Sequence, residues 1–230
     1  MATDIRPGGW QVLPTIIKNL IIINALVWLA QITVGKNGVP MEDLFALHYV
    51  KSDLYKPWQF LTYMFLHDPN GPFHILFNML ALWMFGSTLE NLWGPMRFLL
   101  FYILCGLFAG FVQVLAMGFD INAAMNLYNE GRVPAQVVTG LTDVPVLGAS
   151  GAVMGIFAAF AYSFPNSQLF VFPIPFPIKA KWALLGFVAY DLFGGLYSGG
   201  GIAHFAHIGG AVLGIILVII WNRKNRRNFY

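Results

Sequence analysis

The sequence predicts an all-α membrane protein, a bundle of six transmembrane helices with both termini in the cytoplasm. Hydrophobic residues make up 58% of the 230-residue chain and charged residues only 10%, whereas an ordinary soluble domain has roughly 25% charged residues. The hydrophobic residues also form long uninterrupted runs, and about 20 apolar residues are what a helix needs to cross the bilayer core. We expect residues 1–230 to form a single integral-membrane domain.

Six apolar segments are candidates for these helices. They cover approximately residues 16–34, 73–89, 98–117, 148–164, 178–197 and 203–221. The first segment is not expected to be a cleaved signal peptide, because no small-residue cleavage site follows its apolar core. Two loops lie between spans on the outer side. The loop at about 35–72 is rich in aromatic residues and is expected partly in the membrane interface, whereas the loop at about 118–147 is polar and expected to be solvated.

The basic residues predict the orientation, because Lys and Arg accumulate on the cytoplasmic side. With six spans both termini share one face, which would hold nine of the 13 Lys and Arg residues: Arg6, Lys18, Arg97, Lys179, Lys181, Arg223, Lys224, Arg226 and Arg227. The opposite face would hold Lys36, Lys51, Lys56 and Arg132. The basic C-terminal run adjoins a span directly, so it indicates a topology anchor and not a nucleic-acid site. The compact six-span form without a presequence suggests a bacterial inner membrane.

Nucleotide and metal chemistry have little support in the sequence. No Walker loop, CxxC, HExxH or paired-carboxylate motif occurs, and such motifs carry these functions in other proteins. The single cysteine, Cys105, lies inside the third span, where packing is the expected role. We therefore expect no metal, no other cofactor, and neither a nucleotide nor a nucleic acid as partner.

Several polar side chains lie inside the predicted spans, where such groups are costly and usually functional. They are His74 and Asn78 in the second span, Ser150 at the start of the fourth, Asp191 in the fifth, and His204 and His207 in the sixth. Each has an ordinary structural explanation when taken singly, such as a serine that bonds to a carbonyl one turn back. In the predicted topology, however, His74, Asn78, Ser150 and His207 fall at similar depth below the outer surface. This agreement predicts one polar cavity.

Glycine pairs indicate how two of these residues come together. Gly151 with Gly155, and Gly210 with Gly214, have the small-xxx-small spacing that lets membrane helices approach closely. Packing of the fourth span against the sixth would bring Ser150 within reach of His207. Gly148, two residues before Ser150, is grouped with these glycines as packing support.

A serine beside a histidine indicates nucleophilic catalysis. A serine hydroxyl needs a neighbouring base, and neutral His207 could accept its proton and return it to a leaving amine. No carboxylate is clearly placed to orient the imidazole, so the sequence favours a dyad, with Asp191 as the intramembrane candidate for a third member. The Ser150 backbone N–H at a helix N-terminus, together with His74 and Asn78, could stabilise an oxyanion.

At three motifs the chain resembles the rhomboid family of intramembrane serine proteases. The motifs are His74-Ile75-Leu76-Phe77-Asn78, Gly148-Ala149-Ser150-Gly151 and Ala206-His207-Ile208-Gly209-Gly210, in the family's order. The resemblance implies Ser150 as nucleophile, His207 as general base, and His74 with Asn78 as oxyanion stabilisers. It also implies substrates that are transmembrane proteins within the lipid bilayer, cut in or near their membrane helices, and no cofactor.

The chain departs from the family pattern at two positions. Met154 stands where many members have Tyr or Phe one turn after the serine, and Gln59 follows Trp58 where Arg is typical. His204, three residues before His207, is an alternative base, although the Ala-His-x-Gly-Gly context favours His207. Two other functions stay open: a catalytically inactive rhomboid-like protein that binds membrane clients, and a small transporter. A transporter would predict inverted repeats, and none is visible.

Overall fold

The computed structural model describes residues 10–171, 174–197 and 203–226. Its α-helices are α1 (Thr15–Thr33), α2 (Met41–Phe45), α3 (Gln59–Thr62), α4 (Pro72–Ala81), α5 (Ser87–Trp93), α6 (Pro95–Asn129), α7 (Ala135–Thr142), α8 (Ser150–Ser163), α9 (Ala180–Tyr197) and α10 (His204–Arg226). Two short 3-10 segments are η1 (Gly35–Asn37) and η2 (Tyr63–Phe65), and a π-helical segment, η3 (Leu82–Gly86), joins α4 to α5. Strands β1 (Gln168–Leu169) and β2 (Ile178–Lys179) form a small antiparallel pair between α8 and α9. Arg6 and Arg227 of the predicted topology lie outside the described residues.

Within the described part of the chain, four helical stretches are long and apolar enough to cross a membrane, namely α1, Pro72–Trp93, α6 and the His204–Asn222 part of α10. The predicted fourth and fifth spans form α8 and α9, which are not among these four. Helix α8 is apolar but has only 14 residues, which corresponds to about 21 Å against a hydrocarbon core of about 30 Å. Helix α9 carries Lys181 and Asp191, which lower its mean hydropathy.

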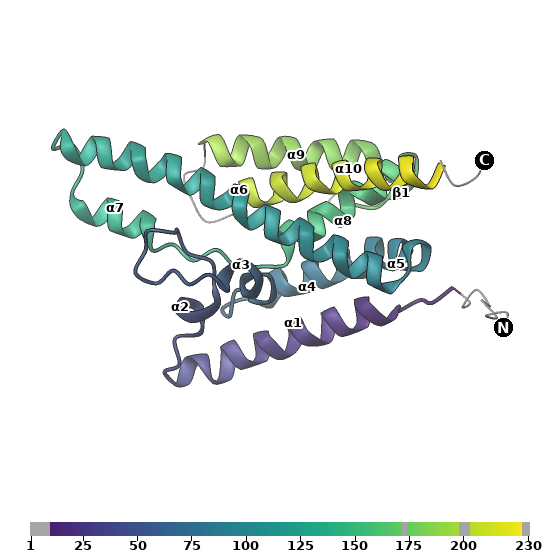
Figure 1. Ribbon diagram of the computed structural model, residues 1–230, viewed down its shortest axis with the longest axis horizontal. Helices are drawn as coiled ribbons and strands as arrows, with labels where there is room; N and C mark the ends of the chain where they lie inside the picture. Colours follow the sequence, from purple (N-terminus) through teal and green to yellow (C-terminus); the bar gives the residue numbers. More distant parts are fainter. Residues whose placement is uncertain (1–9, 172–173, 198–202, 227–230) are drawn as a thin grey trace.

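Helix α8 occupies the centre of the bundle. It packs against α6, α9, α10 and the η3 segment, and ten of its 14 residues are buried. Small side chains (Gly151, Ala152, Gly155, Ala158, Ala159) make this close packing possible. In Figure 1 the start of α1, the α5–α6 turn and the far end of α10 lie at one end of the molecule, and α2, α7 and the last turns of α6 and α9 lie at the other.

Helix α6 is longer than the predicted third span and corrects the expected loop at 118–147. It continues to Asn129 and is followed by α7. Met117, Ile121 and Ala124 are buried on one face of this extension, and Val138 of α7 is buried as well. The spacing of three and four residues is that of an amphipathic helix, so an apolar stripe stabilises a segment whose composition is polar.

The predicted outer loop at 35–72 contains α2, α3 and η2, and it is organised around Gln59. This buried side chain donates from Nε2 to the carbonyls of Asp43 (3.0 Å) and Leu54 (2.9 Å). Its Oε1 accepts from the N–H groups of Lys56 (3.1 Å) and His48 (3.3 Å). One uncharged amide therefore satisfies four backbone groups of the loop at the position where the family pattern has Arg.

Candidate active site

The segment that leads to Ser150 is held by the outer loop. Leu47 and Val146 exchange two backbone hydrogen bonds of 2.8 Å. The N–H of Gly148 donates to the Tyr63 carbonyl at 2.9 Å, and Gly148 has φ +128°, a conformation that glycine adopts readily and other residues rarely do. Helix α8 then begins at Ser150. These hydrogen bonds to the loop thus fix the position of the backbone just before Ser150.

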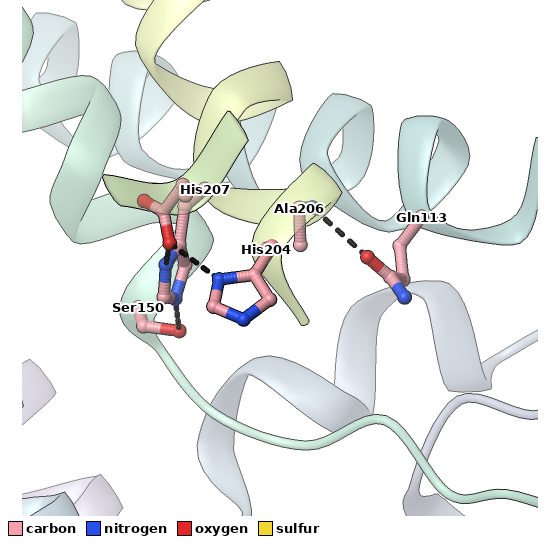
Figure 2. A network of polar contacts seen from close by, with 6 residues as sticks. Gln113, Ser150, His204, Ala206 and His207 are labelled. Atoms are coloured by element: carbon pink, nitrogen blue, oxygen red, sulfur yellow. Dashed lines mark hydrogen bonds and ion pairs between the residues drawn. The ribbon is translucent and has the colours of Figure 1, made fainter. Parts of the chain in front are cut away.

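Ser150 and His207 lie side by side, as Figure 2 shows. The Nε2 atom of His207 is 2.8 Å from Ser150 Oγ. On the other edge of the ring, Nδ1 is 3.0 Å from Oδ1 of Asp191. The carboxylate beside the imidazole is thus Asp191, which the sequence leaves open as a candidate third member beside the favoured dyad. Asp191 and His207 come from different helices, α9 and α10, so only the docking of these helices brings them together.

Asp191 contacts a second imidazole. Nδ1 of His204 is 2.9 Å from the same Oδ1 atom, and both Asp191 and His204 are buried. Among the described residues, the Ser150 hydroxyl makes its hydrogen bond with His207 and not with His204. Of the two candidate bases in the sequence, His207 is therefore the one next to the hydroxyl.

The first turn of α10 is anchored to α6 by Gln113, a residue that the sequence reasoning missed. Its Oε1 accepts from the N–H of Ala206 at 3.1 Å, as Figure 2 shows. Because Ala206 precedes His207, this hydrogen bond helps to fix the backbone position from which the His207 side chain extends. The signal was present in the sequence, because Gln113 is a polar amide inside an apolar span.

His74 and Ser150 border the same small space beside Gly148. A Cβ atom placed on Gly148 would lie 3.0 Å from His74 Nε2 and 3.6 Å from Ser150 Oγ. Asn78, one turn further along α4, is buried, and its Nδ2 has no hydrogen-bond partner within the described part of the chain. His67 packs against the His74 ring with centroids 5.0 Å apart. Among the described residues, Asn78 Nδ2 therefore makes no hydrogen bond with Ser150.

Glycines allow α8 and α10 to meet backbone to backbone. A Cβ on Gly155 would lie 2.9 Å from the Gly210 carbonyl oxygen, and Cβ atoms on Gly210 and Gly214 would collide with the carbonyls of Gly151 and Gly155, respectively. Met154, on α8 one turn after Ser150, is partly buried against the core. Among the described residues, no group of three or more His, Cys, Asp or Glu side chains could hold a metal ion.

The fold and this site define a helical integral membrane protein, and the family follows from sequence comparison. The model of the Rhomboid domain family matches residues 55–224. The chain therefore belongs to the rhomboid family.

Three relatives show how far the similarity extends. Rhomboid protease AarA of Providencia stuartii is 31% identical over 170 residues, which cover 71% of this chain and 56% of that protein. The mitochondrial presenilin-associated rhomboid-like protein of Homo sapiens is 32% identical over 160 residues, or 67% of this chain and 36% of the relative. The mitochondrial Rhomboid protein 1 of Saccharomyces cerevisiae is 30% identical over 143 residues, or 62% and 36%. The chain thus spans about a third of these mitochondrial relatives and just over half of the bacterial one.

Proposed function

We propose that this chain is an intramembrane serine endopeptidase that cleaves transmembrane segments of other membrane proteins. The observation that carries the proposal is the 2.8 Å contact between Ser150 Oγ and His207 Nε2, between two helices packed through glycine. Membership of the rhomboid family and a relative named as a protease support it.

In the proposed reaction Ser150 Oγ attacks the scissile carbonyl carbon while its proton passes to His207 Nε2. The resulting imidazolium gives the proton to the leaving amine as the C–N bond breaks, and an ester remains on Ser150. Water then enters and gives a proton to His207 Nε2 as its oxygen adds to the ester carbon. The imidazolium returns this proton to Ser150 Oγ as the bond between carbon and Oγ breaks, which releases the carboxylic acid and restores the serine. Each step uses groups of this chain and water, so no cofactor is part of the proposal.

The tetrahedral intermediates carry an oxyanion, for which three donors are proposed. The N–H of Ser150 lies in the first turn of α8, where backbone donors have no intrahelical acceptor. His74 Nε2 borders the space next to the serine hydroxyl, and the unpartnered Nδ2 of buried Asn78 is available to donate. In other enzymes one such donor lowers the activation barrier by about 3 kcal/mol.

The proposed topology has six spans, with α8 and α9 as the fourth and fifth, both termini cytoplasmic, and one membrane domain over residues 1–230. The arrangement in Figure 1, with the start of α1 and the end of α10 at the same end, supports it. If the Ser163 end of α8 lies at the cytoplasmic face, the 14 residues of this helix place Ser150 about 21 Å from that face. Ser150 would then lie inside the bilayer, below the outer surface, within reach of water from that side.

The proposed location is a bacterial inner membrane. The relative from Providencia stuartii supports a bacterial setting, whereas the yeast and human relatives are named as mitochondrial. Reporter fusions at both termini, in bacterial cells, test the orientation. A terminus that gives the periplasmic signal would contradict the six-span topology.

Purified protein in lipid vesicles, incubated with a model transmembrane substrate, tests the activity. We expect cleavage by the wild type, loss of cleavage in Ser150→Ala and His207→Ala, and retained cleavage in the control Ser163→Ala at the other end of α8. Retained activity in His207→Ala with loss in His204→Ala would assign the base to His204. A wild type that binds but never cleaves membrane proteins would support the client-binding alternative. A wild type that neither binds nor cleaves them would favour the transporter hypothesis.

A further inference from the structure

We propose that Asp191 and His204 are positioning residues for His207, so that the serine and its base belong to a four-residue relay, Ser150–His207–Asp191–His204. In this relay the Asp191 carboxylate accepts a hydrogen bond from each imidazole and fixes the tautomer of His207. The inference rests on the proposed function and adds two residues to its site.

The tautomer follows from the chemistry of the carboxylate. Ionised Asp191 can only accept hydrogen bonds, so the Nδ1 atoms at 3.0 Å (His207) and 2.9 Å (His204) must each carry hydrogen. A neutral His207 protonated on Nδ1 has a free lone pair on Nε2. That lone pair lies 2.8 Å from Ser150 Oγ, where it can receive the hydroxyl proton. The opposite tautomer would present an N–H to Ser150 and could not act as a base.

The position of His204 is built into the packing of α9 against α10. Gly194, three residues after Asp191, faces the ring so closely that a Cβ there would lie 2.9 Å from His204 Nδ1 and still closer to the Cε1 and Nε2 atoms of the ring. The Tyr190 ring packs edge-on to His204 at 5.8 Å. One stretch of α9 therefore supplies the carboxylate, the space for the imidazole and an aromatic ring that packs against it. The His204 ring is thus held in place by packing as well as by its hydrogen bond with Asp191.

His204 also stabilises the buried carboxylate of Asp191. Asp191 is 2% exposed, and a buried charge is stable only when it is paired and hydrogen-bonded. His207 must be neutral to act as a base, so it offers one hydrogen bond and no charge. His204 offers the second hydrogen bond and, when protonated, the compensating charge. Loss of His204 should therefore destabilise the ionised Asp191 carboxylate and weaken its hydrogen bond with His207.

Three variants in lipid vesicles test the relay: Asp191→Asn, His204→Leu and the control Leu192→Ala, which alters an exposed neighbour on α9. The readouts are kcat and KM for a transmembrane substrate, the labelling rate of Ser150 by a fluorophosphonate, and the detergent-unfolding midpoint. We expect Asp191→Asn to lower kcat and labelling by about 100- to 10,000-fold with KM nearly unchanged, because its amide can donate to Nδ1 and impose the wrong tautomer. His204→Leu should lower kcat on the order of 10-fold, as loss of an orienting partner does.

A spectroscopic readout separates orientation from general support of the fold. The ¹⁵N chemical shifts of His207 in lipid should report Nδ1–H in the wild type and a shift towards Nε2–H in Asp191→Asn. Wild-type kcat and labelling in Asp191→Asn would overturn the relay and leave the proposed protease intact. A wild type that neither cleaves nor is labelled would overturn the protease itself. If Asp191→Asn does not fold, His204→Leu decides, and unchanged kcat in that variant overturns the relay.

Discussion

Acidification should destabilise this protein through His67. This residue lies between η2 and α4, is 0% exposed, and packs against the ring of His74. Burial, reinforced by the neighbouring His74, lowers the pKa of His67 from 6.5 to about 4. The unfolded chain, in which the pKa is near 6.5, therefore binds a proton between these two values that the folded chain does not bind. Stability from this group is complete above pH 6.5 and is lost as the pH falls towards 4.

The size of the effect follows from the two pKa values. A difference of about 2.5, at about 1.36 kcal/mol for each pKa unit, gives a loss of about 3 kcal/mol between pH 6.5 and pH 4. His67→Phe keeps an aromatic ring against His74 and removes the titrating group. Its free energy of unfolding should therefore fall by about 3 kcal/mol less than that of the wild type over the same pH range.

Reversible unfolding in mixed detergent micelles, followed by tryptophan fluorescence at several pH values, measures this difference. Leu66→Val is the matched control, because it alters the buried neighbour of His67 without a titrating group. It should lower stability by about 1 kcal/mol at every pH and leave the pH dependence unchanged. Equal pH dependence in the wild type and His67→Phe would refute the reasoning.

Three further predictions concern contacts that hold the fold, and the same unfolding assay checks them. Glu90, buried at the end of the second span, accepts from the N–H groups of Ile16 and Ile17 in the first turn of α1 at 2.9 Å each, so Glu90→Ala should cost about 2–3 kcal/mol and Glu90→Gln about half as much. Gly210→Ala should cost about 3 kcal/mol because its Cβ would collide with the facing carbonyl of α8, whereas Gly186→Ala, with open space around it, should cost nothing. Gln59→Ala should cost about 3 kcal/mol for four unpaired loop groups, against about 1 kcal/mol for Trp58→Phe, which loses one hydrogen bond. These predictions would be contradicted if Glu90→Ala had no effect, if Gly210→Ala cost no more than Gly186→Ala, or if Gln59→Ala cost no more than Trp58→Phe.

The positions of the long helices could be predicted because apolar runs report burial in lipid directly. The predicted spans at 16–34 and 203–221 differ from α1 and α10 by one residue at the start. The extension of α6 could not be read in the same way, since its polar composition hides an apolar stripe formed by Met117, Ile121 and Ala124. The π-helical segment at 82–86 has no distinctive pattern in the sequence.

For the candidate site too, the sequence predicts the polar residues themselves but not the partners with which they make contact. Ser150, His207, His74 and Asn78 attract attention because polar groups are rare in apolar spans, and that signal needs only the sequence. The partners of these residues depend on how helices dock. Asp191 and His207 are 16 residues apart, and their contact requires one rotation of α9 against α10 that no spacing rule specifies. Gln59 departs from the family pattern in the sequence, but only its four backbone contacts reveal that it holds the loop together.

The two halves of the candidate site are held by different kinds of packing. Ser150 and His207 lie on helices whose glycines leave no room for side chains between the backbones, since a Cβ on Gly155 would lie only 2.9 Å from the Gly210 carbonyl oxygen. Packed interfaces of this kind do not deform continuously. Asp191 lies on α9, which meets α10 through side chains such as His204 and Tyr190. A displacement of α9 would therefore preserve the distance between serine and histidine while it removed the carboxylate from both imidazoles. If the relay operates, the position of α9 controls the orientation of the base, and a substrate helix that displaces α9 would weaken the reactivity of Ser150 until α9 returns.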